Sequence, residues 1–250
     1  MKKLFLIACL ILITACQPVA NAPTPTAMPS RAATATQTSI PFTDTPQPTP
    51  TPEFTPTPLP RFFTDEFDAS PAGWDILQAG SEATPTIRNE NSHLILQMDA
   101  PYNWVYAVYG AQDYEDIRVD ALFTNQAGSP ASIGLVCRYS EKEGWLEYNV
   151  STNGTYSLLY GNWLADGIAD YFPIMDGSSN LIQPSGAAQE IGMVCSGTTV
   201  SLLVNQTVIR NIDVSRYELT NGKIGITASA FENVPVVAAF NWVRVSEPHP

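Results

Sequence analysis

The stretch from Phe62 to Val245 consists mainly of short runs of β-branched and aromatic residues, separated by Gly, Asn, Asp and Ser. Runs of this kind predict β-strands joined by turns. The Asn153-Gly154 dipeptide between two of the runs is a strong hairpin signal. No longer stretch shows the helical period of apolar residues, so almost no helix is expected. The expected strands are 62–67, 93–98, 104–109, 117–123, 132–139, 145–151, 156–160, 189–195, 200–205, 208–212, 223–231 and 236–245.

So many strands in one chain exclude most fold classes. An open strand edge invites pairing with another chain, so a domain of antiparallel strands closes up as a sandwich, a jelly roll or a barrel. We therefore expect one all-β domain over residues 61–250, built from two antiparallel sheets and large enough to bury a substantial core.

The charge of the chain narrows the choice of ligand. Its formal net charge is −12, from 12 Lys and Arg against 24 Asp and Glu. Only three of those basic and two of those acidic residues precede residue 61, so the excess of acid lies in the domain. An acidic surface repels phosphate backbones, so we expect no nucleic-acid partner and favour a neutral ligand or a metal cation.

Residues 1–15 have the pattern of a signal peptide. Lys2 and Lys3 precede an apolar run over 4–13, which is too short to span a bilayer as a helix. The run ends in Ile13-Thr14-Ala15-Cys16, which resembles the lipobox of bacterial lipoproteins. The resemblance implies that Cys16 becomes an acylated N-terminus held in the membrane. The alternative is an ordinary secretory signal with a chance cysteine.

Residues 16–60 form the expected tether. Twelve of the 21 prolines and eleven threonines lie between Gln17 and Pro60, with almost nothing to bury. Such a segment stays extended, and at ~3.1 Å per residue it would reach on the order of 100 Å from the membrane. We therefore expect the domain on the outside of a bacterial cell, facing outward from its lipid anchor.

Two cysteines remain in the expected domain, Cys137 and Cys195, in the matching contexts Gly-Leu-Val-Cys and Gly-Met-Val-Cys. In an oxidising compartment a disulfide between neighbouring strands is the simplest outcome. Two buried free thiols are the alternative. No Cys-x-x-Cys pair suggests a zinc site.

The order of several small motifs carries a family resemblance. The motifs are Phe63-Thr64-Asp65-Glu66-Phe67, Gly73-Trp74, Ile133-Gly134-Leu135-Val136-Cys137, Trp145-Leu146-Glu147-Tyr148-Asn149-Val150, Gly222-Lys223-Ile224-Gly225-Ile226 and Phe240-Asn241-Trp242-Val243. Together they resemble the concanavalin A-like, LamG-type jelly roll of bacterial surface proteins, over about residues 62–247. The resemblance implies two curved antiparallel sheets whose concave face often binds glycans, and some members hydrolyse them.

The residues themselves suggest where a sugar would bind. In the strand 145–151, period 2 places Leu146, Tyr148 and Val150 on one face, which reads as core. The opposite face combines aromatic and polar groups, as a sugar-binding surface requires, although a solvated face is the alternative. A long glycine-rich loop over 163–180 adds further candidates. The candidate glycan-binding residues are Trp145, Glu147, Asn149, Tyr160, Trp163, Asp166 and Tyr171.

A catalytic site is only weakly indicated. Glycan hydrolysis generally needs two facing carboxylates. The run Glu141-Lys142-Glu143-Gly144-Trp145-Leu146-Glu147 lacks the aspartate of the glucanase pattern, and Glu141 and Glu143 read as solvated turn residues. Glu147 is the better candidate, with Arg138 as a neighbour for a structural ion pair. The signature of 3-keto-disaccharide hydrolase-like domains is not found, so we predict no catalytic residue.

Calcium is the remaining ligand to consider. Asp65, Glu66 and Asp68 are hard oxygen donors, and some jelly rolls of this type hold a structural calcium near such residues. Acidic solvation of a strand edge is the favoured alternative, and no cofactor is required. Three functions remain open: a lipid-anchored glycan-binding or adhesion domain, a glycoside hydrolase acting through Glu147, and a structural sandwich that meets a protein partner.

Overall fold

The computed structural model describes residues 59–69 and 72–249. The expected signal peptide, Cys16 and nearly all of the expected tether lie outside the described residues. The described residues form fifteen strands and one 3-10 turn at Ser215–Tyr217. The strands are β1 Phe63–Asp65, β2 Trp74–Gly80, β3 Thr86–Asn89, β4 Leu94–Met98, β5 Asn103–Tyr114, β6 Ile117–Asn125, β7 Ser132–Ser140, β8 Gly144–Ser151, β9 Thr155–Ala165, β10 Ile168–Ser178, β11 Ala188–Ser196, β12 Thr199–Val204, β13 Thr207–Asp213, β14 Gly222–Ala230 and β15 Val236–Ser246.

The strands form two antiparallel sheets that pack as a sandwich. Sheet A has the order β13-β12-β11-β6-β15-β4-β3, with β1 paired to β15. Sheet B has the order β10-β9-β8-β7-β14-β5-β2. Consecutive strands pair over β7–β10 and over β11–β13, whereas β14 and β15 return from the end of the chain to lie between earlier strands; β14, for example, lies between β5 and β7. The all-β, two-sheet antiparallel fold expected from the sequence is confirmed.

The main core lies between the two sheets and follows the alternation along each strand. Leu146, Tyr148 and Val150 of β8 all point into it and are buried, as the period-2 pattern predicted. Val119 and Phe123 of β6 meet them from sheet A. Burying apolar side chains from both sheets at one interface supplies most of the favourable free energy of folding for a domain of this kind.

Every expected strand has a counterpart in the structure, but the glycine-rich segment 163–180 was wrongly predicted as a loop. Most of it forms β10, which pairs with β9 along its length. Asp166-Gly167 makes the tight turn, with Gly167 at a φ of 69° that favours glycine. β10 is an edge strand with little burial, so its sequence carries no apolar alternation that would have revealed it.

A disulfide joins Cys137 of β7 to Cys195 of β11, with Cα atoms 6.8 Å apart. The predicted pairing is therefore confirmed. The expectation that it would link neighbouring strands is wrong, because β7 belongs to sheet B and β11 to sheet A. Both side chains point into the core, where the bond crosses from one sheet to the other.

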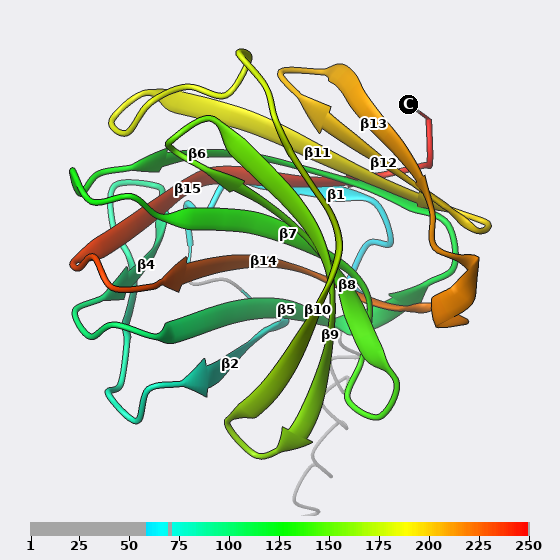
Figure 1. Cartoon of the computed structure of the whole chain (residues 1–250), viewed down its shortest axis with the longest axis horizontal. Coiled ribbons are helices and arrows are strands. Elements are labelled where there is room, and N and C mark those ends of the chain that lie inside the picture. The colour runs from blue at the N-terminus through cyan, green and yellow to red at the C-terminus, as the bar shows by residue number, and fades with distance from the viewer. Residues whose placement is uncertain (1–58, 70–71, 250) are drawn as a thin grey trace, which may run out of the picture. The chain divides into compact units, whose positions relative to one another are not determined.

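Figure 1 shows how β9 and β10 leave the edge of sheet B and run together across its other strands towards β2. Their tip is fastened there, because the amide of Gly80 donates a 3.0 Å hydrogen bond to the carbonyl of Gly167. Within the described part of the chain, no helix has the length and apolar character needed to cross a bilayer.

Candidate functional site

A second apolar cluster lies on the face of sheet B that points away from the main core. Tyr106, Tyr139 and Trp145 form its buried centre. The ring of Trp145 lies 5.5 Å from that of Tyr106 and 5.2 Å from that of Trp163, measured between centroids. Tyr171 stands edge-on to Trp145 at 6.1 Å. We call these rings, together with Trp104, the aromatic cluster.

The β9–β10 hairpin covers this cluster. Trp163 of β9 and Tyr171 of β10 project from the hairpin onto the sheet, and the indole of Trp163 donates a 2.9 Å hydrogen bond to the hydroxyl of Tyr139. Gly161 lets the hairpin approach closely, because a side chain there would collide with the indole of Trp145. Trp145 is consequently 0% exposed.

Glu147 lies beneath the same cover and is fully buried. Its Oε2 accepts hydrogen bonds from the hydroxyl of Tyr106 at 3.0 Å and the indole of Trp145 at 2.9 Å. Its Oε1 accepts one from Nδ2 of Asn149 at 2.8 Å. Burial raises the pKa of Glu147 above its ordinary value, and the three hydrogen bonds oppose that rise. The carboxyl group is therefore held by three neutral donors.

The hydrogen bonds extend from Glu147 to the hairpin. Tyr106 gives its only hydroxyl proton to Glu147, so the 2.7 Å contact between Tyr106 and Tyr171 has Tyr171 as donor. Burial raises the pKa of Tyr106 well above its ordinary value, which keeps that proton in place. Glu147 thus acts as a structural acceptor that ties β5, β8 and β10 together.

The face that the sequence assigned to Trp145, Glu147 and Asn149 is confirmed, since all three point away from the main core. The expectation that they form an open stacking surface is wrong for Trp145 and Glu147, because the hairpin seals both. The alternation of residues along a strand determines which face of the sheet each side chain occupies, but it does not show whether another segment of the chain covers that face.

The other predicted glycan-binding residues separate into different places. Trp163 and Tyr171 join the aromatic cluster. Tyr160 lies on the opposite face of β9, where it packs against the main core and stacks on Tyr217 at 4.9 Å. Asp166 lies at the exposed hairpin tip. The structure therefore does not bring these residues together in one site.

Arg138 does not pair with Glu147, so that suggestion is wrong. A β-bulge between Cys137 and Ser140 shifts the register of β7, and Arg138 has a φ of 54° within it. Its guanidinium group instead donates to the carbonyl oxygens of Leu219 at 2.7 Å and Gly197 at 2.6 Å. Glu141 and Glu143 are exposed turn residues, as predicted.

The predicted calcium ligands do not converge on a metal site among the described residues. The Asp65 carboxylate accepts hydrogen bonds from the amide of Phe67 and the indole of Trp74, both at 2.9 Å. Over residues 59–69 and 72–249, no three His, Cys, Asp or Glu side chains gather as a metal would require. Asp65, Glu66 and Asp68 therefore do not form a metal-binding group with a further acidic residue in this structure.

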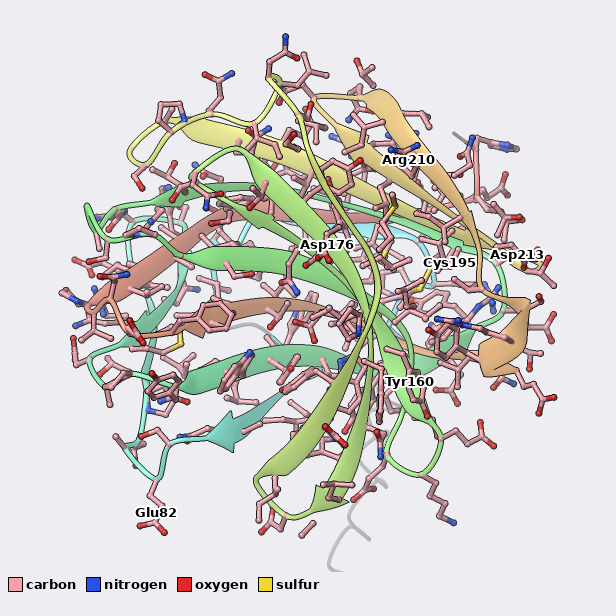
Figure 2. All side chains as sticks on the ribbon, viewed as in Figure 1. Glu82, Tyr160, Asp176, Cys195, Arg210 and Asp213 are labelled. Carbon is pink, nitrogen blue, oxygen red and sulfur yellow. A yellow bond between two sulfur atoms is a disulfide. The ribbon has the colours of Figure 1, made fainter. Side chains whose placement is uncertain are left out.

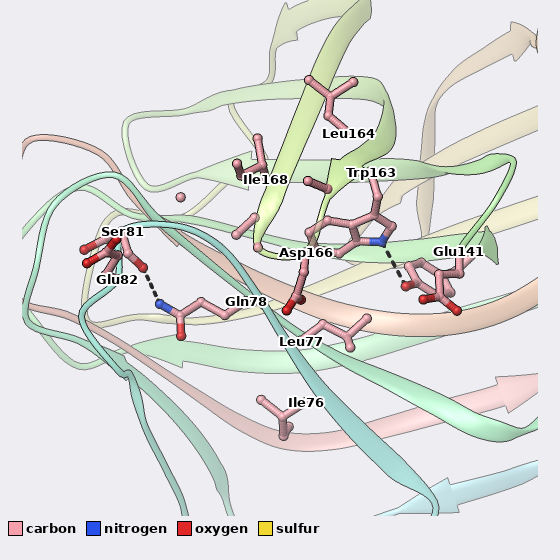
Figure 3. Close-up of a pocket in the computed structure, with 15 residues that line it drawn as sticks. Ile76, Leu77, Gln78, Ser81, Glu82, Glu141, Trp163, Leu164, Asp166 and Ile168 are labelled. Carbon is pink, nitrogen blue, oxygen red and sulfur yellow. Dashed lines mark hydrogen bonds between the residues drawn. The ribbon is translucent and has the colours of Figure 1, made fainter.

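Two cavities lie beside the region in which the hairpin buries Trp145 and Glu147. The first, of about 870 Å³, lies between β2 and the hairpin tip, and we call it the tip cavity. Figure 3 shows Trp163, Asp166 and Ile168 on one side of it and Gln78 on the other. Its carboxylates, Glu82, Glu141 and Asp166, are exposed and come from separate segments.

The second cavity, of about 470 Å³, lies where β7 begins and β8 ends, and we call it the end pocket. Asn149 and Ser151 of β8 line it together with Asp176 of β10, which Figure 2 labels on the crossing strand. Phe231 and Asn233, from the loop after β14, complete its rim. Sequence reasoning found only Asn149 here, because the lining comes from strands and loops far apart in the chain and no local pattern joins them.

Comparison with known proteins places the fold but not the family. No protein-family model matches the chain, and no curated protein matches its sequence. Among solved structures, a Bacillus licheniformis β-glucanase superimposes with a TM-score of 0.52 at 13% identity, covering 74% of this chain and 98% of that one. A carbohydrate-binding module, CBM66 from Bacillus subtilis, gives 0.50 at 13% identity over 67% of this chain and 91% of the module. A Bacillus subtilis protein of unknown function with a galectin-like fold gives 0.53 at 13% identity, covering 74% and 94%.

The domain therefore has the jelly-roll sandwich fold that also occurs in glucanases and in a carbohydrate-binding module. At such low identity the likeness concerns the path of the chain alone, and function has to be argued from the site.

Proposed function

We propose that this protein is a carbohydrate-binding domain without hydrolytic activity, displayed on the outside of a bacterial cell by a lipid-anchored tether. The observation that carries the proposal is the burial of Glu147 and the commitment of its carboxyl group to protein hydrogen bonds. It lies on the face of sheet B that points away from the main core, yet it is buried under the hairpin and its oxygens accept three protein hydrogen bonds.

Hydrolysis of a glycosidic bond needs a carboxyl group that reaches the bond and a second one about 5–9 Å away. Glu147 cannot reach a substrate in this arrangement. The end pocket has Asp176 as its one acidic lining residue, and the acids of the tip cavity are dispersed. These features support binding over catalysis.

The fold and the polar lining of the end pocket support a sugar as the ligand. Proteins bind sugars by stacking an aromatic side chain on the ring and by offering amide, hydroxyl and carboxylate groups to its hydroxyls. Such groups line the end pocket beside the exposed ring of Phe231. The surplus of acidic residues in the domain also favours a neutral polymer over an anionic one.

The direct test combines a glycan array with a hydrolysis screen on the same sample of full-length protein in mild detergent. The proposal predicts binding to at least one neutral glycan without release of new reducing ends. Release of reducing ends that disappears in Glu147→Gln would instead support the alternative, a glycoside hydrolase of the glucanase or 3-keto-disaccharide hydrolase type.

The anchoring part of the proposal rests on the sequence around Cys16 and on its likeness to bacterial lipoproteins, and a LamG-type assignment of the domain rests on ordered motifs alone. Cys16→Ser is expected to abolish metabolic palmitate labelling and to release the protein from the membrane fraction. Labelling that is unchanged by the substitution would contradict lipidation at this residue.

A further inference from the structure

The end pocket has the size and lining of a site for a small polar ligand. Its volume of about 470 Å³ falls within the usual range of about 300–1,000 Å³ for ligand pockets. Its walls carry hydroxyl or amide groups from Ser132, Ser151, Asn153 and Asn233. None of its lining residues is a Lys or Arg, so it offers no counter-charge to a phosphate or carboxylate.

Asn149 anchors the pocket to the buried network. It is only 4% exposed, and its Nδ2 is committed to Glu147 at 2.8 Å. Its Oδ1 is buried without a hydrogen-bond partner in the protein. This oxygen lies against β7, because a Cβ at Gly134 would come within 2.5 Å of it. The groups that can meet a ligand are therefore the hydroxyl and amide groups of the rim residues, which suit a sugar with hydroxyl groups around its ring.

Phe231 supplies the apolar surface at the rim. It is 49% exposed, so about half of its ring is open to solvent at the pocket. Trp104 supports it edge-on at 5.6 Å and stacks in turn on Tyr171 of the hairpin at 5.6 Å. Phe231 is thereby held in place before a ligand arrives, which lowers the entropy cost of binding.

The same row of rings runs from the rim of the pocket to the hairpin. Phe231, Trp104 and Tyr171 connect the rim to the hairpin, and the hairpin continues across sheet B to Gly80. A polysaccharide lying along the whole face of the sheet would have to pass through these rings. The hairpin therefore converts a through-running cleft into a pocket with an end.

We infer that the end pocket binds the terminal unit of a neutral glycan, with Phe231 stacking on the sugar ring and Asp176 accepting hydrogen bonds from its hydroxyls. The inference rests on the proposed function and adds the location of the site and the part of the glycan it reads. The β9–β10 hairpin is the element that determines this specificity.

The first experiment locates the site. The full-length protein in detergent is titrated against neutral gluco-, galacto-, manno-, xylo- and fructo-oligosaccharides immobilised through their reducing ends. Phe231→Ala should weaken binding about tenfold or more, because it removes the stacking surface. Phe172→Ala is the matched control, since Phe172 is 47% exposed but lies outside the pocket, and it should leave binding within about twofold.

Asp176→Asn provides a second variant that leaves the core untouched, because Asp176 is exposed on the edge strand β10. Loss of affinity in both Phe231→Ala and Asp176→Asn supports the inference. Binding that persists in both variants would overturn it while leaving the proposed function intact. No binding of the wild-type protein to any oligosaccharide would overturn the proposed function itself.

The second experiment tests whether the site reads chain ends. The polysaccharide built from the sugar that binds best is partly depolymerised, so that chains cut to a tenth of their length carry about ten times more ends per gram. Recognition of a terminal unit predicts that binding per gram rises in the same proportion. Binding per gram that stays constant or falls as the chains shorten would show internal recognition and contradict the inference.

Discussion

The two ends of one face of sheet B have opposite characters. At the hairpin end, Trp145 and Glu147 are completely buried under rings from β9 and β10. At the other end, Ser151 and Phe231 surround an open pocket. Along β8 a single residue, Tyr148, separates Glu147 from Asn149, the next residue on the same face, which lines the pocket. The difference shows that the position of the β9–β10 hairpin, and not the alternation of residues along β8, determines the fate of each part of this sheet face. The part under the hairpin is buried and stabilises the fold, and the uncovered part stays open to a ligand.

The largest effect on stability is expected at the hairpin end of the face, where Trp145 is buried. Trp145→Ala should destabilise the domain by about 3–5 kcal/mol, because it leaves a large cavity and removes one hydrogen bond from a buried carboxyl group. The free energy of unfolding from chemical denaturation measures the loss. A change below about 1 kcal/mol would mean that the indole is not buried in solution and that the two ends of the face are alike.

The second prediction concerns the disulfide, which lies in the main core on the other side of sheet B. Cys137 points into the main core, whereas Val136 before it joins the aromatic cluster. The bond closes a loop between residues 58 apart, and replacing both cysteines by alanine should cost about 4 kcal/mol in the chain-entropy model. Non-reducing mass spectrometry should also join the two peptides. Alkylation of both thiols in the protein without prior reduction would contradict the bond.

The protonation of Glu147 gives a pH test of the sealed end. The folded-state pKa is raised by burial above its ordinary value of 4.5. The folded protein therefore holds the proton of the Glu147 carboxyl group more tightly than the unfolded chain does. The resulting contribution of Glu147 to the free energy of unfolding is fully present below pH 4.5 and is lost as the pH rises through the raised pKa of the folded state. Glu147→Gln removes this titration.

Denaturation of both proteins across the acid-to-neutral range isolates the effect from that of the other acidic groups. The stability of the wild type relative to Glu147→Gln should fall as the pH rises. A constant difference would mean that Glu147 titrates as an exposed carboxyl group, which would break the contrast between the two ends.

The smallest effect is expected at the open end. Phe231→Ala should change the free energy of unfolding by less than about 1 kcal/mol, because half of the ring is already in contact with solvent. Thermal unfolding next to Phe172→Ala supplies the comparison. A loss as large as that of Trp145→Ala would show that Phe231 belongs to the aromatic cluster and not to a binding rim.

Local sequence patterns were sufficient for much of the fold. The alternation in β8 assigned Leu146 and Trp145 to opposite faces, and the export expected from the sequence predicted the pairing of Cys137 with Cys195. Strands β2 and β3 were missed, since both are edge strands and their partly exposed residues show no clear alternation. β10 was missed for the same reason.

Much less of the candidate site than of the fold could be predicted from the sequence. The closure of the hairpin depends on Trp163 and Tyr171 meeting Trp145 across three strands, which is a tertiary contact without a local signal. The lining of the end pocket depends on loops such as the one carrying Phe231, more than 80 positions from Asn149 in the chain. The bulge that turns Arg138 away from Glu147 likewise has no signature in the residue types.

The most direct measurement of the central claim is a chemical-shift map of the chain from Gln17 onward, titrated with the oligosaccharide that binds best on the array. The account predicts that backbone amide signals shift at Asn149, Ser151, Asp176 and Phe231, while those of Trp145 and Glu147 move little. Shifts centred on Trp163 and Asp166 at the hairpin tip, with the end pocket unchanged, would contradict it.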